Sequence, residues 1–405
     1  MDKVAHRVKE RSGQPEISRV KRLVVTLCSS LMVVGLIWQP LSADARTRTR
    51  LPQVAVPKVV SQAPGNSAET ACLIDVDTGR ILYEKNADKR MRIASLTKII
   101  TAWIAVRSGK LDQVATASQN AVRQEGSSIY LAPGEKQTLR ALTYALMMRS
   151  GNDAATTIAE FLDGSTEKFA EHMNRDVRGL GLTHSHFVNP HGLDHDEHYS
   201  TAHDMAVITA AALHNPEFKK IVSTRAYTIP WQGQKWDRKM RNKNKLLWMM
   251  DGADGVKTGY TKKAGRCLAS SATKDGHQVA LVVLRDGNDW VDSMHLLTYG
   301  LTGYERRNVA ELVHRDYVAA VRYGVRNDVA LRTLGSVTYP LLRDETAEIE
   351  ARTQIKTLSA PVRKGAVAGR VEYWFKGQKL GAVQLVATES VEPKGFWGRL
   401  RGIFS

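Results

Sequence analysis

Cysteine is scarce in this chain, which has 405 residues and only three cysteines. A disulfide framework is therefore not expected, and an ordinary hydrophobic core must stabilise the fold. Cys28 lies in an apolar N-terminal stretch, whereas Cys72 and Cys267 lie in apolar runs typical of strands. We predict that Cys72 and Cys267 are buried free thiols rather than an oxidised pair.

Acidic residues are few relative to basic ones, and aromatic residues make up only 7% of the chain. The formal net charge is +17. A surplus of this size suits an anionic surface, such as phospholipid headgroups, an acidic wall polymer or nucleic acid. No nucleic-acid-binding motif accompanies the charge, so we predict a membrane or wall environment and no nucleic acid partner.

The N-terminal apolar stretch, from Leu23 to Trp38, is short for a membrane span. Seven Lys and Arg residues precede it, and Ala43-Asp44-Ala45 follows, a small-residue pattern typical of a cleavage site. We predict that residues 1–45 are a signal peptide, with an uncleaved single-span anchor as the alternative. In either case the rest of the chain lies outside the cytoplasm, in the periplasm or at the outer face of the cytoplasmic membrane.

The next two parts of the chain differ in their patterns. Residues 46–66 contain prolines and no periodicity, which predicts an extended linker. Residues 67–305 combine strand and helix patterns, with strands at both ends and helices between them. This order predicts an α+β domain in which one antiparallel sheet is completed by both ends of the segment. The expected strands cover 71–76, 81–83, 255–261, 266–272 and 277–285, and the expected helices 99–106, 138–148 and 154–162.

The C-terminal part has a different character. Residues 310–392 alternate short strands and turns, which predicts a small all-β domain, a sandwich or a barrel. Residues 393–405 would place their apolar side chains on one helical face and their basic ones outside it, which predicts an amphipathic membrane-anchoring tail. The alternative is a frayed end that packs on the β-domain. The apolar face contains Phe396, Trp397, Leu400, Ile403 and Phe404.

Three short motifs point to chemistry. Ser95-x-x-Lys98 opens an apolar helical run, and this spacing brings a hydroxyl and an amine together on one helix face. An amine kept neutral there could act as the base for a serine nucleophile. The spacing alone is weak evidence, because Ser18/Lys21, Ser165/Lys168 and Ser271/Lys274 share it.

The other two motifs add specificity. Ser150-Gly151-Asn152 lies in a turn between two predicted helices, and Lys257-Thr258-Gly259 lies on a predicted strand. A competing Ser118-Gln119-Asn120 lacks the two flanking helices that would fix it beside a cleft. Three motifs in distinct structural contexts are far more specific than any one of them.

With these motifs the chain resembles the low-molecular-mass penicillin-binding proteins, the serine-type D-Ala-D-Ala carboxypeptidases of the dacA type (peptidase family S11). Further similarity lies in Gly126-Ser127-Ser128, in 187–193, in 200–206 and in 242–248. The resemblance implies a penicillin-binding/β-lactamase-like transpeptidase domain with an antiparallel sheet and a helical subdomain, followed by the all-β domain. It also implies a stem peptide of peptidoglycan ending in D-Ala-D-Ala as substrate, β-lactams as inhibitors and no cofactor.

The resemblance implies the following roles. Ser95 is the acylated nucleophile and Lys98 its base, while Ser150 and Asn152 complete the catalytic set. Lys257 and Thr258 bind the terminal carboxylate, and Gly259 admits the substrate backbone to the strand. Tyr260, Thr261 and Lys243 complete the substrate-binding set, with Lys243 standing where the family often has arginine and Tyr260 where several relatives have histidine.

Other functions stay open at this point. A D,D-endopeptidase acting on cross-links shares the motifs, as does a β-lactamase, although no Glu-x-x-x-Asn follows Asn152 before Lys257. Six of the twelve histidines lie between 184 and 203, so a metal site is a further alternative, although no His-Glu-x-x-His is present. A wall-binding scaffold is the non-enzymatic alternative. The oligomeric state is not predicted.

Overall fold

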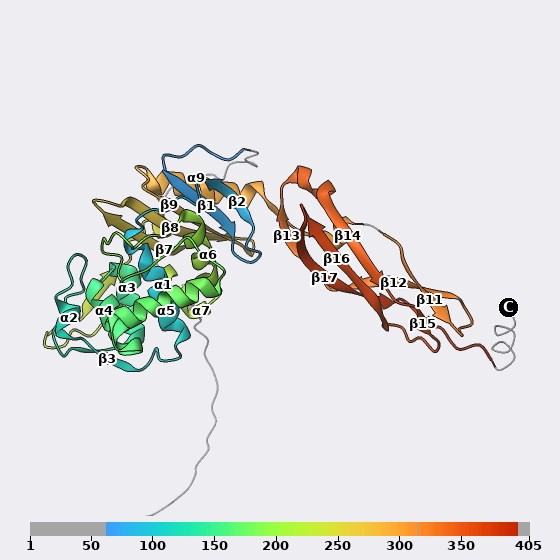
Figure 1. Ribbon diagram of the computed structural model, residues 1–405, viewed down its shortest axis with the longest axis horizontal. Coiled ribbons are helices and arrows are strands. Elements are labelled where there is room, and N and C mark those ends of the chain that lie inside the picture. The colour runs from blue at the N-terminus through green and yellow to red at the C-terminus, as the bar shows by residue number, and fades with distance from the viewer. Residues whose placement is uncertain (1–61, 314, 396–405) are drawn as a thin grey trace, which may run out of the picture. The chain divides into compact units, whose positions relative to one another are not determined.

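The computed structural model describes residues 62–313 and 315–395 (Figure 1). The predicted signal peptide, most of the predicted linker and the amphipathic face of the predicted tail lie outside these residues. Within the described residues no helix is both long enough and apolar enough to cross a membrane.

A five-stranded antiparallel sheet organises the first part of the chain, in the order β2-β1-β9-β8-β7. The first two strands come from the start of this part and the other three from its end, as the sequence predicts. Strand β7 forms one edge of the sheet, and β2 forms the other. The strands are β1 Thr70–Asp75, β2 Ile81–Lys85, β7 Ala253–Thr261, β8 Gly265–Lys274 and β9 His277–Leu284.

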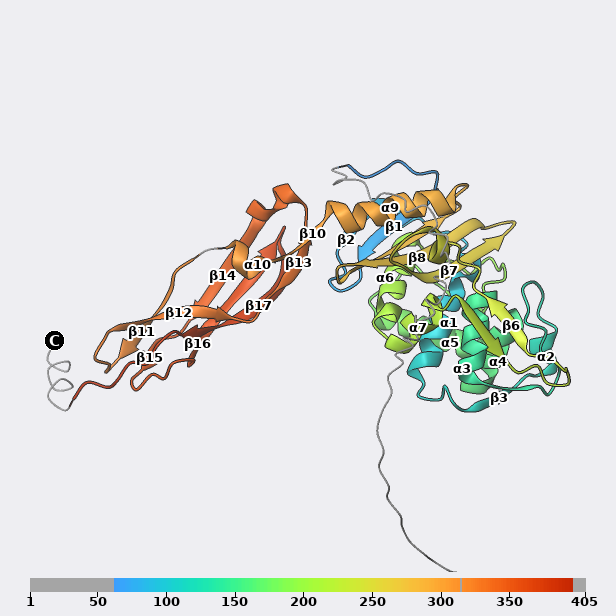
Figure 2. The ribbon, with the colours of Figure 1, turned by 180° about the vertical axis from the view of Figure 1, so that it is seen from behind.

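Both faces of this sheet are covered, so β1 and β9 are buried along their whole length and β8 along its middle. On β1, Leu73 packs with Leu296 and Leu297 of helix α9, whereas Cys72 and Ile74 join the core formed with the other helices. Figures 1 and 2 show α9 along one face of the sheet and α6 and α1 at the other. The free thiols Cys72 and Cys267 are buried, as predicted.

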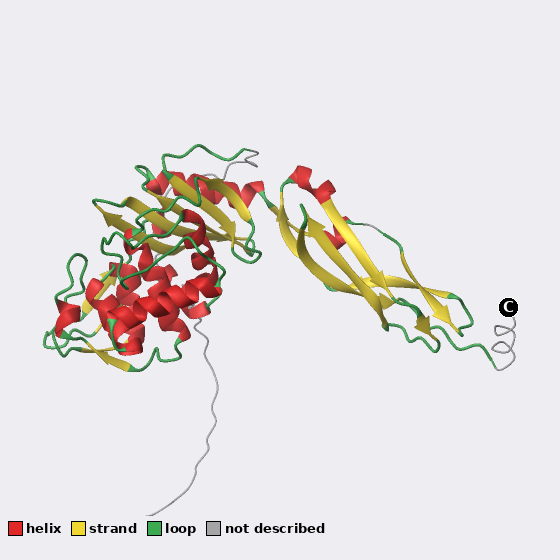
Figure 3. Ribbon diagram, in the orientation of Figure 1, coloured by secondary structure: helices red, strands yellow, loops and turns green. Residues whose placement is uncertain are grey.

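The helices between β2 and β7 form a separate layer, red in Figure 3. Two small two-stranded antiparallel sheets, β3–β4 and β5–β6, flank it. The helices are η1 Ala94–Thr97 (a 3₁₀ turn), α1 Lys98–Arg107, α2 Gln119–Val122, α3 Leu139–Arg149, α4 Asn152–Asp163, α5 Thr166–Gly179, α6 Ala202–Leu213, α7 Pro216–Ser223, α8 Leu246–Met249 and, after the sheet, α9 Asp289–Gly303. The hairpin strands are β3 Val114–Thr116, β4 Lys136–Thr138, β5 Ala226–Ile229 and β6 Arg238–Arg241.

The last part is built on a six-stranded sheet in the order β14-β16-β17-β12-β11-β15. Its core consists of residues between 309 and 391 alone, including Tyr373 and Leu385. The elements are β10 Glu305–Asn308, α10 Val309–Leu312, β11 Tyr317–Arg322, β12 Asp328–Leu334, β13 Thr338–Leu341, η2 Arg343–Glu348, β14 Ile349–Ile355, β15 Leu358–Ser359, β16 Val367–Phe375 and β17 Gln378–Ala387. The α+β class followed by a mainly β region agrees with the sequence analysis.

Two details of the predicted helices differ from the structure. Ser95 lies in the 3₁₀ turn η1, and the α-helix proper begins at Lys98. The helix predicted at 154–162 is α4, which begins at Asn152. The turn after α3 needs only two residues, Ser150 in the left-handed conformation (φ 66°) and Gly151. Of the α-helices in the described residues, only α1, α3 and α4 were predicted.

Candidate active site

The turn that carries Ser95 is held against the edge strand of the sheet. A Cβ on Gly259 of β7 would come within 3.0 Å of the Ile93 carbonyl oxygen and 3.3 Å of the Ser95 nitrogen. A Cβ on Gly192, whose φ is +85°, would overlap the carbonyl of Ala94. Glycine at both positions therefore allows two backbone segments to pack directly on the serine turn.

Lys98 is fully buried one turn after Ser95. Its Nζ lies 3.0 Å from Ser95 Oγ, 2.7 Å from Asn152 Oδ1 and 2.5 Å from the His191 carbonyl oxygen. The last two groups only accept hydrogen bonds, so a neutral amine donates its two hydrogens to them and directs its lone pair at the serine hydroxyl.

The electrostatics favour this neutral amine. Burial, followed by the nearby cations Lys257 and Lys243, holds the pKa of Lys98 well below its ordinary value. Lys257 itself is buried, with Nζ donating to the Thr258 carbonyl at 2.7 Å. Burial and then Lys243 lower the pKa of Lys257 to about 7.

The second motif reaches the same place from the helical layer. Ser150 ends α3, and Asn152 opens α4, where its side-chain amide donates to the Glu125 carbonyl. The Asn152 backbone N–H donates to the Ser127 carbonyl at 2.7 Å. Loop 125–128 is thus tied directly to the amide that holds Lys98.

These groups surround a cleft of about 720 Å³. Six of the ten predicted site residues line it, and Lys98, Asn152 and Lys257 lie behind this lining, completely or almost completely buried. The Thr261 hydroxyl donates instead to Asp194 at 3.0 Å, and Thr261 is not part of the lining. The predicted residues in the lining are Ser95, Ser150, Lys243, Thr258, Gly259 and Tyr260.

Five lining residues are not in the predicted set. Arg266 and Cys267 lie on β8 opposite Tyr260 and Gly259, and Asp289 and Trp290 open helix α9. Arg266 forms an ion pair with Asp289. The fifth, Ser127, lies within a stretch that carries the family resemblance, which is the one signal that could have indicated it.

The other motif matches lie elsewhere. Ser165 caps α5 by accepting from the Lys168 backbone N–H, and Ser271 lies on β8, while Ser18 is outside the described residues. Ser118 caps α2, and the Asn120 amide donates to Glu160 at 2.8 Å. Among the described serines with these spacings, Ser95 differs in lining the cleft with its hydroxyl 3.0 Å from a buried lysine amine.

The histidine-rich segment supports the serine turn. His198 Nε2 lies 2.8 Å from Thr97 Oγ1, and the carbonyl of His191 accepts from Lys98. Burial lowers the pKa of both imidazoles to about 3, so both are neutral near pH 7. Among the described residues no group of three or more His, Cys, Asp or Glu side chains is arranged to hold a metal ion.

Comparison with known proteins identifies this arrangement. Residues 57–288 match the family described as D-alanyl-D-alanine carboxypeptidase. The chain belongs to this family. Residues 310–393 match the penicillin-binding protein 5 C-terminal domain. This membership makes the chain a hydrolase of the D-Ala-D-Ala carboxypeptidase kind and a penicillin-binding protein.

Relatives of this carboxypeptidase match it over most of its length. The D-alanyl-D-alanine carboxypeptidase DacF of Bacillus subtilis is 31% identical, covering 93% of this chain and 96% of the relative. DacC of Escherichia coli is 32% identical, covering 84% and 88% respectively.

Solved structures agree in fold. Penicillin-binding protein 5 of Haemophilus influenzae has a TM-score of 0.63 at 30% identity, covering 82% of this chain and 99% of that one. The Streptomyces K15 DD-transpeptidase has a TM-score of 0.56 at 32% identity, covering 59% and 99% respectively. The predicted family and the predicted transpeptidase-like fold are therefore confirmed.

Proposed function

We propose that this protein is an exported, membrane-associated carboxypeptidase that removes the terminal D-alanine of peptidoglycan pentapeptides through an acyl-enzyme on Ser95. One observation carries the proposal. The amine of Lys98 is fully buried, and its three hydrogen-bonding neighbours include the hydroxyl of a serine that lines the cleft.

Acylation begins with the Ser95 hydroxyl. Lys98 takes its proton as Oγ attacks the carbonyl carbon of the penultimate D-alanine. Charge develops on the carbonyl oxygen, where the backbone N–H groups of Ser95 and Tyr260 stabilise it, each donor being worth about 3–4 kcal/mol. Ser150 passes the proton to the nitrogen of the departing D-alanine, so the C–N bond breaks as free D-alanine leaves.

Deacylation uses the same base, with water in place of the serine as the nucleophile. A water molecule gives a proton to the Lys98 amine and attacks the ester carbon, and the Ser95–acyl bond breaks. The products are the shortened peptide acid and the free serine, which recovers its proton. A β-lactam presents an equivalent amide and keeps its leaving nitrogen tethered, so it acylates Ser95 and remains bound.

The enzyme recognises its substrate by the terminal carboxylate. Lys257 and Thr258 stand beside the serine turn on β7, and Lys243 faces them with Nζ 3.3 Å from Ser127 Oγ. Lysine offers a point charge where arginine would offer a two-pronged contact, so we expect Lys243 to hold the carboxylate less rigidly than arginine would. Tyr260 contributes its backbone N–H to the oxyanion hole, and the residue, 67% exposed, lines the cleft.

D-alanine release measured on a peptide ending in D-Ala-D-Ala tests this proposal. Ser95→Ala abolishes release, whereas Ser165→Ala, which removes a serine with the same spacing to a lysine, preserves it. Full release by Ser95→Ala would reject the serine mechanism. Cleavage of cross-linked dimers in preference to the pentapeptide would make the protein an endopeptidase, and rapid penicillin turnover would make it a β-lactamase.

A further inference from the structure

A row of positive side chains follows strand β6 and the segment after it. Alternate residues from Arg238 to Lys245 are buried and exposed, the pattern of an extended strand with two faces. The buried positions are Arg238, Met240, Asn242 and Asn244, and the exposed ones Lys239, Arg241, Lys243 and Lys245. We call these four exposed residues the cation row.

The charge of the cation row is not neutralised locally. Residues 225–245 contain seven Lys and Arg residues but only one acidic residue, Asp237. Within residues 62–313 and 315–395, no carboxylate forms an ion pair with a member of the row. Arg241 lies over the ring of Trp248 instead, with 4.6 Å between the guanidinium carbon and the ring centroid.

The cation row leads into the active-site cleft. Lys243 lines the cleft, and Lys245 Nζ lies 5.9 Å from the ring centroid of Trp290, which also lines it. Alternate residues of an extended chain are about 7 Å apart, so Lys239 lies up to about 14 Å from Lys243 along the row. Lys239 and Arg241 are thus placed to meet a group other than the one that Lys243 and Lys257 bind.

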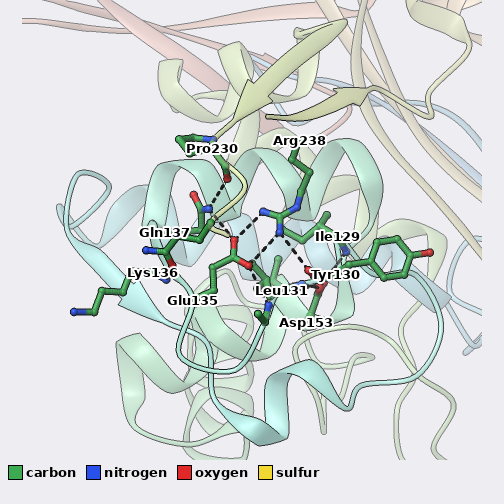
Figure 4. Close-up of polar contacts among 12 residues, drawn as sticks. Ile129, Tyr130, Leu131, Glu135, Lys136, Gln137, Asp153, Pro230 and Arg238 are labelled. Atoms are coloured by element: carbon green, nitrogen blue, oxygen red, sulfur yellow. Dashed lines mark hydrogen bonds and ion pairs between the residues drawn. The ribbon is translucent and has the colours of Figure 1, made fainter. Parts of the chain in front are cut away.

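The segment that carries the row is rigidly held. On its buried face, the Arg238 guanidinium pairs with Glu135 at 2.9 Å and also donates to the Tyr130 carbonyl (Figure 4). The Asn242 side chain donates to the carbonyls of Val222 and Thr224 at 3.2 and 3.0 Å. The spacing of the exposed cations is therefore a fixed feature of the fold.

We propose that the cation row binds further carboxylates of an acidic peptide substrate, outside the D-Ala-D-Ala terminus, and steers that peptide into the cleft. This inference rests on the proposed function and adds to it a substrate class, a peptide with at least two carboxylates beyond its terminus. A row of like charges that leads to a cleft raises the local concentration and the association rate of an oppositely charged substrate. One member of the row, Lys243, lines the cleft itself, which favours the substrate over a membrane surface as the partner of the row.

The test compares the double variant Lys239→Glu/Arg241→Glu with the control Lys274→Glu/Lys364→Glu. Both change the net charge equally, and the control lysines are exposed and outside the cleft lining. The substrates are one glutamate-containing peptide ending in D-Ala-D-Ala and the same peptide with its glutamate carboxylates amidated.

For the acidic peptide we expect the row variant to lose about tenfold in kcat/KM at low salt, with kcat nearly unchanged. The loss should shrink at high salt, because screening shortens the range of the interaction. The amidated peptide and the rate of acylation by benzylpenicillin should be unaffected, which shows that the variant is folded.

Three results would overturn the inference. An equal loss in the control variant would mean that net charge alone acts, and an equal loss on the amidated peptide would give the row a structural role. Unchanged kinetics with lost binding to phosphatidylglycerol vesicles would assign the row to a membrane. In each case D-alanine release would still depend on Ser95, so failure of this inference is distinct from failure of the proposed function.

Discussion

At the scale of single residues, the account depends on one buried amine being neutral. Lys98 contacts the serine hydroxyl, an amide oxygen and a backbone carbonyl, and no carboxylate is among these partners. An ammonium there would have to be buried beside Lys257 with no counter-charge in contact, which is costly.

Replacing Lys98 by methionine tests this role directly. We expect acylation by penicillin to slow by about 10²–10⁴-fold, the usual contribution of a general base. Lys98→Arg should not restore the rate, because a guanidinium stays charged. Stopped-flow acylation rates measure both variants, and a fast Lys98→Arg enzyme would contradict a neutral base.

The pH dependence of acylation is predicted from Lys257. Its pKa is lowered to about 7, so the free enzyme loses this cation, and with it affinity for the substrate carboxylate, as the pH rises through that value. In Lys257→Arg the cation persists at alkaline pH, so the alkaline fall in the second-order acylation rate should move to higher pH. If the alkaline fall in the acylation rate stays at the same pH in Lys257→Arg, a group other than Lys257 causes that fall.

At the scale of elements, loop 126–135 joins the helical layer to the β5–β6 hairpin. Asp153 of α4 accepts from Ser128 Oγ at 2.6 Å and from two backbone N–H groups of the loop, those of Ile129 and Leu131. Glu135, at the other end of the loop, pairs with Arg238 of β6, and both side chains are almost fully buried. Figure 4 shows the Arg238 guanidinium pointing at this carboxylate.

Breaking this pair should destabilise the protein. Arg238→Met leaves Glu135 buried without its partner, and we expect a loss of about 3–5 kcal/mol in the free energy of unfolding. Burial raises the pKa of Glu135, but Arg238 and other hydrogen-bond donors outweigh it, so the net pKa is lowered. The stability from this carboxylate is therefore present above its unfolded-state pKa and is lost as the pH falls below it.

Denaturant unfolding measures this loss. The double variant Glu135→Leu/Arg238→Met removes both charges and should recover much of the stability, because no buried charge remains unpaired. If the double variant loses as much free energy of unfolding as the single variants Glu135→Leu and Arg238→Met lose together, the two side chains are not coupled as the structure indicates.

The elements also show how much of the fold and of the site can be predicted from the sequence. The three motifs predicted a helix start, an inter-helix turn and a strand, because local spacing encodes these. Arg266 and Trp290 could not be predicted, since their position depends on the register of β8 against β7 and on where α9 meets the sheet. The carbonyl of His191 was also unpredictable, because any residue supplies a carbonyl and only the packing of Gly192 places it.

At the scale of the whole molecule, the catalytic groups and the six-stranded sheet belong to separate parts of the chain. The cleft lining ends at Trp290, and the core of the last part begins at Val309. The predicted domains, 67–305 and 310–392, remain a proposal that truncation can test, as do the signal peptide and the membrane-anchoring tail.

A chain ending at residue 304 should keep its reaction with penicillin, because it retains every residue that lines the cleft. Labelling by a fluorescent penicillin, compared with the full chain at equal concentration, measures this. Labelling that disappears in a truncated chain with intact secondary structure by circular dichroism would show that the last part contributes to the site.

Mass spectrometry of the protein after treatment with benzylpenicillin tests the central claim most directly. The account predicts one added penicilloyl group, located by peptide mapping on the fragment that contains Ser95 and absent from Ser95→Ala. An adduct on any other residue, or one that persists in Ser95→Ala, would contradict it.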